Sequence, residues 1–171
     1  MKVFKAIFAG IVGGLLMTGI GWLVRAGGLD FNAEMMLGSM LGYPEGQDAW
    51  VIGLGVHLVI SIFVALLYAA AFEGVAHRAG PAAGFSFSVI HTLVAGLALL
   101  ALPAIHPLIP EQMSAPGAFM VNMGAPIVGV FIVEHIMFGI VVGAIYGTVR
   151  HPYTREVVDR REVVDRHEVV A

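Results

Sequence analysis

Four long stretches without charged side chains constrain this chain more than any other feature. No Asp, Glu, Lys or Arg occurs in residues 6–24, 49–72 or 79–110, and Glu134 is the single one in residues 113–149. A helix that spans a membrane needs about 20 apolar residues. The sequence therefore predicts four membrane-spanning helices, at residues 5–25, 49–72, 82–103 and 124–148.

The composition excludes several classes of protein. Of the 171 residues, 58% are hydrophobic and 12% are charged, and the mean hydropathy is +0.89. Soluble domains carry about 25% charged residues, so a soluble enzyme is excluded. The net charge of −3 argues against a nucleic-acid partner, and the absence of cysteine excludes disulfides and thiolate metal sites. We predict an all-α polytopic membrane protein, a bundle of four transmembrane helices in a lipid bilayer.

Basic residues are distributed unevenly between the two sides of the predicted bundle. Eight of the nine Lys and Arg residues precede the first span, separate the second from the third, or follow the fourth; Arg25 is the exception. Because Lys and Arg favour cytoplasmic loops, we expect both termini in the cytoplasm and the protein in a bacterial inner membrane. The first apolar stretch is longer than the core of a signal peptide, about 7–15 residues, so we expect it to be retained.

The connecting segments differ in character. Apolar residues recur at helical spacing in residues 32–41, which predicts a short interfacial helix on the membrane surface. Four prolines between residues 103 and 116 predict an irregular second outer loop. The sequence Glu-Val-Val recurs three times in residues 150–171, which we interpret as a charged cytoplasmic tail separate from a membrane domain of residues 1–149.

The second and fourth spans resemble each other. Residues 57–69 align without a gap to residues 135–147, so that histidine coincides with histidine and Tyr68 with Tyr146. The first and third spans match more weakly, with Ala9-Gly10 and Thr18 falling on Ala83-Gly84 and Thr92. This pattern favours two repeated helical hairpins, related by a pseudo-twofold axis along the membrane normal.

Small residues follow each of these two histidines at intervals of four. In membranes, such rows allow close approach of helix backbones, so we expect the rows to pack spans two and four together in the bundle interior. Leu66, beside one row, is expected to face lipid. The predicted packing positions are Ser61, Ala65 and Ala69 after His57, and Gly139, Gly143 and Gly147 after His135.

A layer of potential metal ligands is predicted near the membrane midplane. If Tyr68 and Tyr146 mark the cytoplasmic interface, His57 and His135 lie about 16 Å deeper, near half of a ~30 Å hydrocarbon core. His91 and Met17 reach a similar depth. Two imidazoles would suit haem b, and three imidazoles with a thioether would suit copper. The alternative is polar packing between helices, and the loop residues His77 and His106 should not contribute.

Glu134 is the one acidic residue predicted inside the membrane. A carboxyl group in apolar surroundings favours its neutral form, which fits a proton-linked role with His57, His91 or a partner subunit. The alternative is a structural hydrogen bond to Ser86, Ser88 or Thr92.

Methionines are concentrated in the outer segments. Thioether groups bind Cu(I), although methionine is also a common apolar contact residue. The six outer methionines are Met35, Met36, Met40, Met113, Met120 and Met123.

Short motifs give one resemblance. Ala9-Gly10, Met17-Thr18, Asp30, the Met-Leu-Gly-Ser-Met-Leu-Gly sequence at 36–42 and the two His…Tyr elements resemble an uncharacterised family of small bacterial four-helix inner-membrane proteins, a domain of unknown function. The resemblance covers residues 1–149 and implies location and fold, but no activity.

Three classes of function follow from these observations. The main hypothesis is a non-enzymatic accessory or structural membrane subunit, which packs through the small-residue rows against other subunits or a second copy. The alternatives are a redox protein with haem or copper at the histidine layer, and a small proton-coupled carrier. No catalytic motif is present in the sequence.

Overall fold

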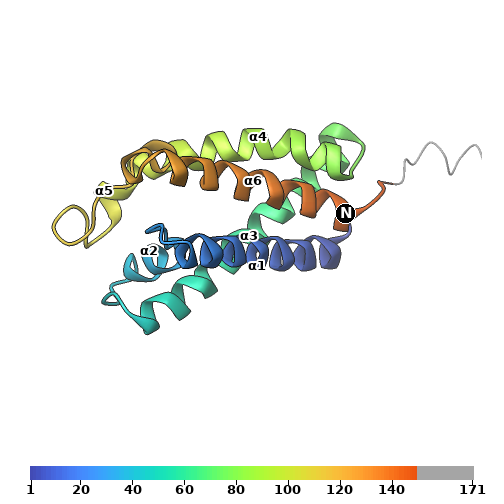
Figure 1. The fold of residues 1–171 in the computed structure, drawn as a ribbon. Coiled ribbons are helices and arrows are strands. Elements are labelled where there is room, and N and C mark those ends of the chain that lie inside the picture. Colours follow the sequence, from blue (N-terminus) through green and yellow to red (C-terminus); the bar gives the residue numbers. More distant parts are fainter. Residues whose placement is uncertain (150–171) are drawn as a thin grey trace, which may run out of the picture.

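Four long apolar helices carry the fold (Figure 1). The computed structural model describes residues 1–149, and the predicted cytoplasmic tail lies outside them. The first long helix, α1, comprises Val3–Ala26, and α3 comprises Gln47–Ala71 with a further turn of π-helix, η1, at Phe72–Ala76. The third, α4, comprises Pro81–Ala98 and continues through η2 (Leu99–Ala101) and α5 (Leu102–Ile105). The last, α6, comprises Ala125–Tyr146.

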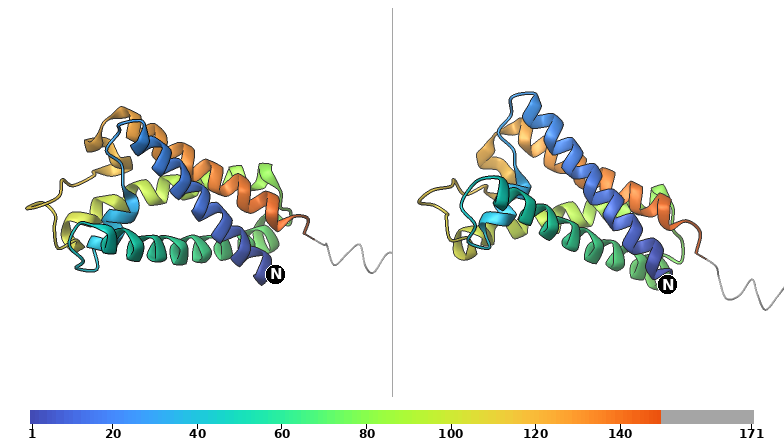
Figure 2. Two further views of the ribbon diagram at one scale, coloured as in Figure 1. Left: turned by 60° about the horizontal axis from the view of Figure 1, so that its bottom comes forward. Right: turned by 90° about the horizontal axis from the view of Figure 1, so that it is seen from below.

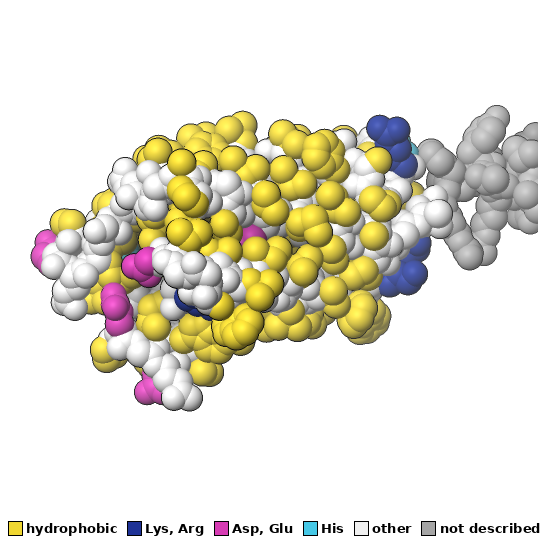
Figure 3. All heavy atoms as spheres, viewed as in Figure 1, with side chains coloured by type: hydrophobic (Ala, Val, Ile, Leu, Met, Phe, Trp, Pro, Cys, Tyr) yellow, Lys and Arg dark blue, Asp and Glu magenta, His cyan; other side chains and the backbone are white. Residues whose placement is uncertain are grey.

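The outward surface of the helices confirms the prediction of an integral membrane protein. All four helices are long and apolar enough to cross a membrane. Large apolar side chains cover the length of the bundle (Figure 3), with Phe4 88% and Val59 67% exposed. Such exposure is incompatible with water but suits contact with lipid chains.

The two ends of the bundle carry opposite charges (Figure 3). Lys2 and Lys5 stand at the start of α1, and Arg78 lies between η1 and α4, at the end that holds the N-terminus, which we call the basic end. The other end, the acidic end, holds two shorter elements, α2 (Ala33–Ser39) and the 3-10 segment η3 (Ala118–Met123) (Figure 2). The acidic end therefore has most of the structure outside the spans.

The predicted interfacial helix is present as α2, but its environment differs from the prediction. The buried residues of α2 are Glu34, Gly38 and Ser39, whereas Leu41 just beyond its end is 57% exposed. The helix packs against α3 with this small and polar face. The spacing of the apolar residues predicted the helix correctly. Its small residues, and not its apolar ones, determine which face packs against α3.

The second span is longer than predicted. It extends from Gln47 to Ala76, so Tyr68 lies two turns before its end. Tyr68 is buried, and its hydroxyl lies 3.4 Å from Nδ1 of His91. Tyr146, by contrast, ends α6. The depth of the two histidines in the membrane stays a prediction.

The small-residue rows pack against different helices from those predicted. The main neighbours of α3 are α1 and α2, and those of α6 are α4 and α1, so α3 and α6 make little direct contact. A Cβ on Gly10 of α1 would lie 2.8 Å from the carbonyl oxygen of Ser61, and one on Gly139 would lie 2.6 Å from that of Gly84. Each row thus serves a contact within its own hairpin.

The row positions differ in their roles. Ala65 and Ala69 are fully buried, and a Cβ on Gly143 would overlap the carbonyl of Gly80. Gly147 instead ends α6 with a φ of 69°, where added atoms would meet nothing. Glycine is favoured at this position because of the left-handed backbone conformation, and not because of close packing. Leu66, predicted to face lipid, is partly buried against the core.

Equivalent positions of the two hairpins make equivalent contacts. Under the predicted alignment, Gly14 corresponds to Ser88 and Ser61 to Gly139. A Cβ on Gly14 would lie 2.7 Å from Oγ of Ser61, and one on Gly139 would lie 2.5 Å from Cβ of Ser88. Each contact pairs a glycine with a serine. The glycine lies on α1 in the first hairpin, whereas it lies on α6, the second helix, in the other hairpin. Duplication of an ancestral hairpin stays a prediction.

At the basic end, three helices are joined by one tyrosine. The hydroxyl of Tyr146 donates to Oε1 of Glu73 at 2.7 Å and accepts from the backbone N–H of Lys2 at 2.9 Å. Its ring also packs on Phe72, with centroids 5.6 Å apart. This contact fixes the ends of α1, η1 and α6 relative to one another.

Gly143→Ala is expected to destabilise the bundle, because the new methyl group would overlap the backbone of α4 at Gly80. Overpacking of this kind costs about 1–3 kcal/mol, so the thermal unfolding temperature in detergent should fall. Gly129→Ala is the matched control on the same helix, since nothing lies within 4 Å of the added atom. An equal effect of both substitutions would show that the close contact is not important.

Candidate functional site

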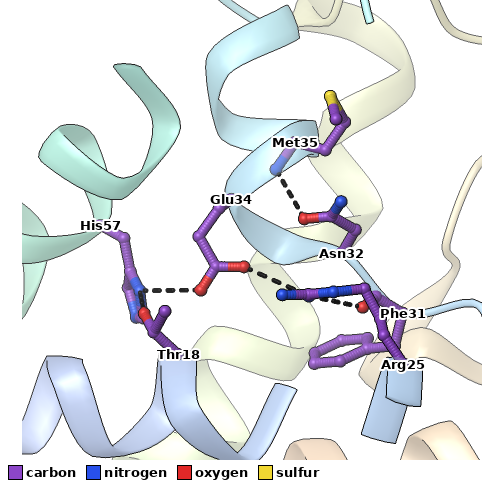
Figure 4. Close-up of polar contacts among 7 residues, drawn as sticks. All are labelled: Thr18, Arg25, Phe31, Asn32, Glu34, Met35 and His57. Carbon is purple, nitrogen blue, oxygen red and sulfur yellow. Dashed lines mark hydrogen bonds and ion pairs between the residues drawn. The ribbon is translucent and has the colours of Figure 1, made fainter. Parts of the chain in front are cut away.

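Three ionisable side chains meet inside the acidic end of the bundle (Figure 4). The carboxylate of Glu34 on α2 lies between Arg25, at the end of α1, and His57 on α3. Its Oε2 is 3.6 Å from Nη1 of Arg25, and its Oε1 is 3.7 Å from Nδ1 of His57. The Glu34 side chain is only 3% exposed. A buried carboxylate of this kind depends on its partners for stability.

The remaining hydrogen bonds orient the partners of Glu34. Nη1 of Arg25 donates to the carbonyl oxygen of Phe31 at 2.9 Å. Oγ1 of Thr18 on α1 lies 3.3 Å from the same Nδ1 of His57 (Figure 4). These polar contacts therefore connect α1, α2 and α3 at one point.

Glycines on both sides of the interface allow α2 to come close enough to α3. A Cβ on Gly53 of α3 would overlap the carbonyl of Glu34, and one on Gly38 of α2 would overlap that of Ala49. The start of α2 is capped by Asn32, whose Oδ1 accepts from the N–H of Met35 at 3.0 Å. Without these two glycines the carboxylate of Glu34 could not reach His57.

His106 holds α2 from the opposite side. It lies in the second connecting segment but is only 3% exposed. Its Nε2 donates to the carbonyl oxygen of Met36 at 3.0 Å, and its Nδ1 accepts from the N–H of Leu108 at 3.2 Å. Oγ of Ser39 lies 3.3 Å from Nε2. His106 is therefore a structural residue of the acidic end, a role that its position in a loop did not predict.

Glu134 of α6 is the fourth member of this site, which we call the ionisable cluster: Arg25, Glu34, His57 and Glu134. Glu134 is 4% exposed, and its Oε1 has no hydrogen-bond partner among residues 1–149. A Cβ on Gly21 of α1 would lie 3.6 Å from both this Oε1 and Nη1 of Arg25. Glu134 thus points toward α1 and the charges of Arg25 and Glu34.

The predicted hydroxyl partners of Glu134 are bonded elsewhere. Oγ of Ser88 donates to the carbonyl oxygen of Phe85 at 2.7 Å, and Oγ1 of Thr92 donates to that of Ser88 at 2.7 Å. Ser86 is exposed and donates to Ala82. Oε1 of Glu134 has no hydrogen bond to any of these hydroxyls within residues 1–149. A hydrogen bond from a protonated Glu134 to one of them stays a prediction.

The predicted histidine layer divides into two parts. The rings of His91 and His135 lie together, with centroids 5.0 Å apart, and Nδ1 of His135 donates to the carbonyl oxygen of Phe131 at 2.7 Å. His57 instead faces Glu34, and Met17 is buried in the apolar core. Within residues 1–149, no three His, Cys, Asp or Glu side chains are grouped to hold a metal ion. Haem or copper at this layer stays a prediction.

Sequence reasoning missed Arg25 and Glu34. In the sequence, Arg25 stands out only as the exception to the charge asymmetry, and Glu34 is not singled out. The sequence does contain a feature that indicates the burial of Glu34. Glu34 lies in the first turn of α2 and Gly38 lies four residues later, so the two share one face of the helix. A carboxylate on the same face as a small residue is typical of a face that packs closely against a partner.

Comparison with known proteins adds no assignment. No protein family, curated protein or solved structure matches this chain. The family resemblance of the short motifs is thus supported only in its coarse form, a protein with four membrane-spanning helices.

Gly53→Ala is expected to separate α2 from α3, because the added methyl group would occupy the position of the Glu34 carbonyl. Backbone amides of residues 33–39 should then exchange with deuterium faster, as local unfolding becomes easier. Gly55→Ala provides the control on the same helix, since its added atom meets nothing within 4 Å. Unchanged exchange in Gly53→Ala would contradict this account of how Glu34 is buried.

Proposed function

We propose that the protein is a small proton-linked membrane carrier, in which the ionisable cluster binds and releases the proton. The observation that carries this proposal is the buried Oε1 of Glu134, which lacks a hydrogen-bond partner among residues 1–149. Ionisable residues inside a membrane are costly and mark proton and ion pathways. In the cluster, Oε1 of Glu134 is the buried side-chain oxygen for which residues 1–149 provide no hydrogen bond.

The charges in the cluster support a proton-binding role. Arg25 and Glu34 neutralise each other, so a proton on Glu134 and a neutral His57 leave the cluster without net charge. Release of the Glu134 proton from the cluster would leave one net negative charge beside Arg25 and Glu34. A buried uncompensated charge costs about 3–5 kcal/mol when a partner is removed, so proton release should be coupled to movement or to entry of a cation.

The location of the cluster also favours a carrier. Its members come from α1, α2, α3 and α6, so a change in charge acts on contacts among four separate elements. Transporters bind coupling ions where independently moving helices meet. Because Glu34 is carried by the short helix α2, a displacement of α2 would remove its carboxylate from Arg25 and His57 and open the cluster to the acidic end.

The alternative of an accessory subunit receives less support. An accessory subunit that packs through the small-residue rows needs these rows to be exposed to another subunit. Ser61 and Gly139 instead pack against α1 and α4 within the chain. The exposed surface that remains is apolar along its length, as lipid contact requires.

The charge distribution supports a cytoplasmic basic end in a bacterial inner membrane. Lys2 and Lys5 stand at the start of α1 and Arg78 lies between η1 and α4, all at that end, whereas Arg25 lies at the other end of α1. Because Lys and Arg favour the cytoplasmic side, this asymmetry supports the proposed orientation.

Glu134→Gln is expected to abolish proton binding at the cluster, because the amide has the same shape but cannot ionise. In proteoliposomes with an internal pH-sensitive dye, potential-driven proton flux should fall at least about tenfold, since a positioned proton-transfer group contributes about 10²–10⁴. The infrared band of a protonated carboxyl should also disappear from the difference spectrum between acidic and alkaline pH.

Glu111→Gln is the control, since Glu111 is exposed in the second connecting segment. It should leave both the flux and the carboxyl band unchanged. Absence of a titrating carboxyl band in the unmodified protein, or equal flux with Glu134→Gln, would refute the proposal.

Reporter fusions test the proposed orientation. Fusions after Gly46 and Pro116 lie at the acidic end and should report an external location, whereas one after Tyr153 should report the cytoplasm. A cytoplasmic signal after Gly46 would reverse the orientation.

A further inference from the structure

A cavity rich in methionine opens at the acidic end of the bundle. Its volume is about 390 Å³, and it lies between α2, the second connecting segment and η3. Five of the nine methionines of the chain line it: Met35, Met36, Met113, Met120 and Met123. The carboxylates of Asp30 and Glu45 also face it. The proton-linked function does not use these residues.

We propose that this cavity binds a soft monovalent metal ion, Cu(I). Thioether sulfur is a soft ligand that selects Cu(I) over the hard divalent cations. Neither histidine nor cysteine lines the cavity, so its donor set does not favour Zn²⁺. Asp30 and Glu45 supply the negative charge that neutral thioethers lack, which favours entry of a cation.

The backbone around Met120 supports a built site. Phe119 and Met120 have φ angles of 52° and 63°, a left-handed conformation that is uncommon for residues other than glycine. Such strain persists where the surroundings enforce it and is typical of ligand sites. Met120 is only 3% exposed and yet lines the cavity. The strained turn therefore holds a thioether at the inner wall.

Two of the other sulfur atoms lie beside polar groups. Sδ of Met35 accepts from the N–H of Gly46 at 3.3 Å. Sδ of Met113 lies 3.5 Å from Oγ of Ser39, whose nearest acceptor is the carbonyl oxygen of Met35 at 2.9 Å. These contacts place thioethers of α2 and of the second connecting segment beside buried or fixed polar groups. Met36 and Met123 bring further thioethers from α2 and η3, and unbranched methionine side chains adapt readily to a ligand.

A small organic cation is the competing ligand for this cavity. The volume is within the range of small-molecule sites, about 300–1,000 Å³, and the carboxylates would attract a positive charge. Cu(I) is favoured because a site for an organic cation would be lined by aromatic faces, whereas Phe31 is the one aromatic residue here. The experiment therefore includes both ligands.

The test is anaerobic titration of the purified full-length protein with Cu(I), in competition with a chromophoric Cu(I) chelator. The unmodified protein should remove about one Cu(I) per chain from the chelator. The double variant Met36→Leu/Met120→Leu should bind at least about tenfold more weakly, equivalent to about 1.4 kcal/mol. Exchange of methionine for leucine nearly conserves volume, and circular dichroism verifies that the variant is folded.

The matched control is Met137→Leu, which changes a methionine of α6 that does not line the cavity. It should bind Cu(I) like the unmodified protein. The proposal is overturned if the unmodified protein takes no Cu(I), if Met36→Leu/Met120→Leu binds as tightly as this control, or if His135→Ala abolishes binding while Met36→Leu/Met120→Leu does not. Binding of tetraethylammonium in place of Cu(I) would likewise assign the cavity to an organic cation.

Discussion

The close approach of α2 to α3 is the contact on which the functional part of this molecule depends. It is a contact between backbones. The position that a Cβ on Gly38 or Gly53 would occupy is taken by a backbone carbonyl of the facing helix. In an apolar medium, packing of this kind replaces the hydrophobic effect as the force that holds helices together. Its consequence is electrostatic, since it carries the carboxylate of Glu34 into the bundle and brings it to Arg25 and His57.

The segment between the first two spans therefore has two faces with different chemistry. Toward the bundle, α2 presents Glu34 and Gly38. Toward the second connecting segment, it presents Met35 and Met36 to the methionine cavity. His106 joins the two faces, because it binds the backbone of α2 at Met36 and lies beside Ser39. A movement of α2 would thus alter the ionisable cluster and the cavity together.

The sequence predicted the spans well because each is a long, uninterrupted physical signal. It predicted α2 as a helix for the same reason, from apolar residues at regular spacing. It did not predict which helices pack together, because rows of small residues on four apolar helices are compatible with several pairings. Glu34 was missed because a carboxylate in a short connecting helix is ordinarily solvated. Its burial follows from the close approach of α2 and α3, which two glycines, Gly38 and Gly53, make possible. Glu134 was found because a lone carboxylate in an apolar span has no ordinary explanation.

The two hairpins share a packing pattern but differ where chemistry is possible. Gly10 meets Ser61 as Gly84 meets Gly139, so the helix contacts are equivalent. His57 and His135 occupy aligned positions too, yet His57 faces Glu34 whereas His135 packs on His91 and Phe131. The difference arises from α2, whose Glu34 reaches His57, whereas within residues 1–149 no carboxylate is paired with His135. A short helix packed against one histidine-bearing span is sufficient to make that histidine a member of an ionisable cluster, while the other remains a packing residue.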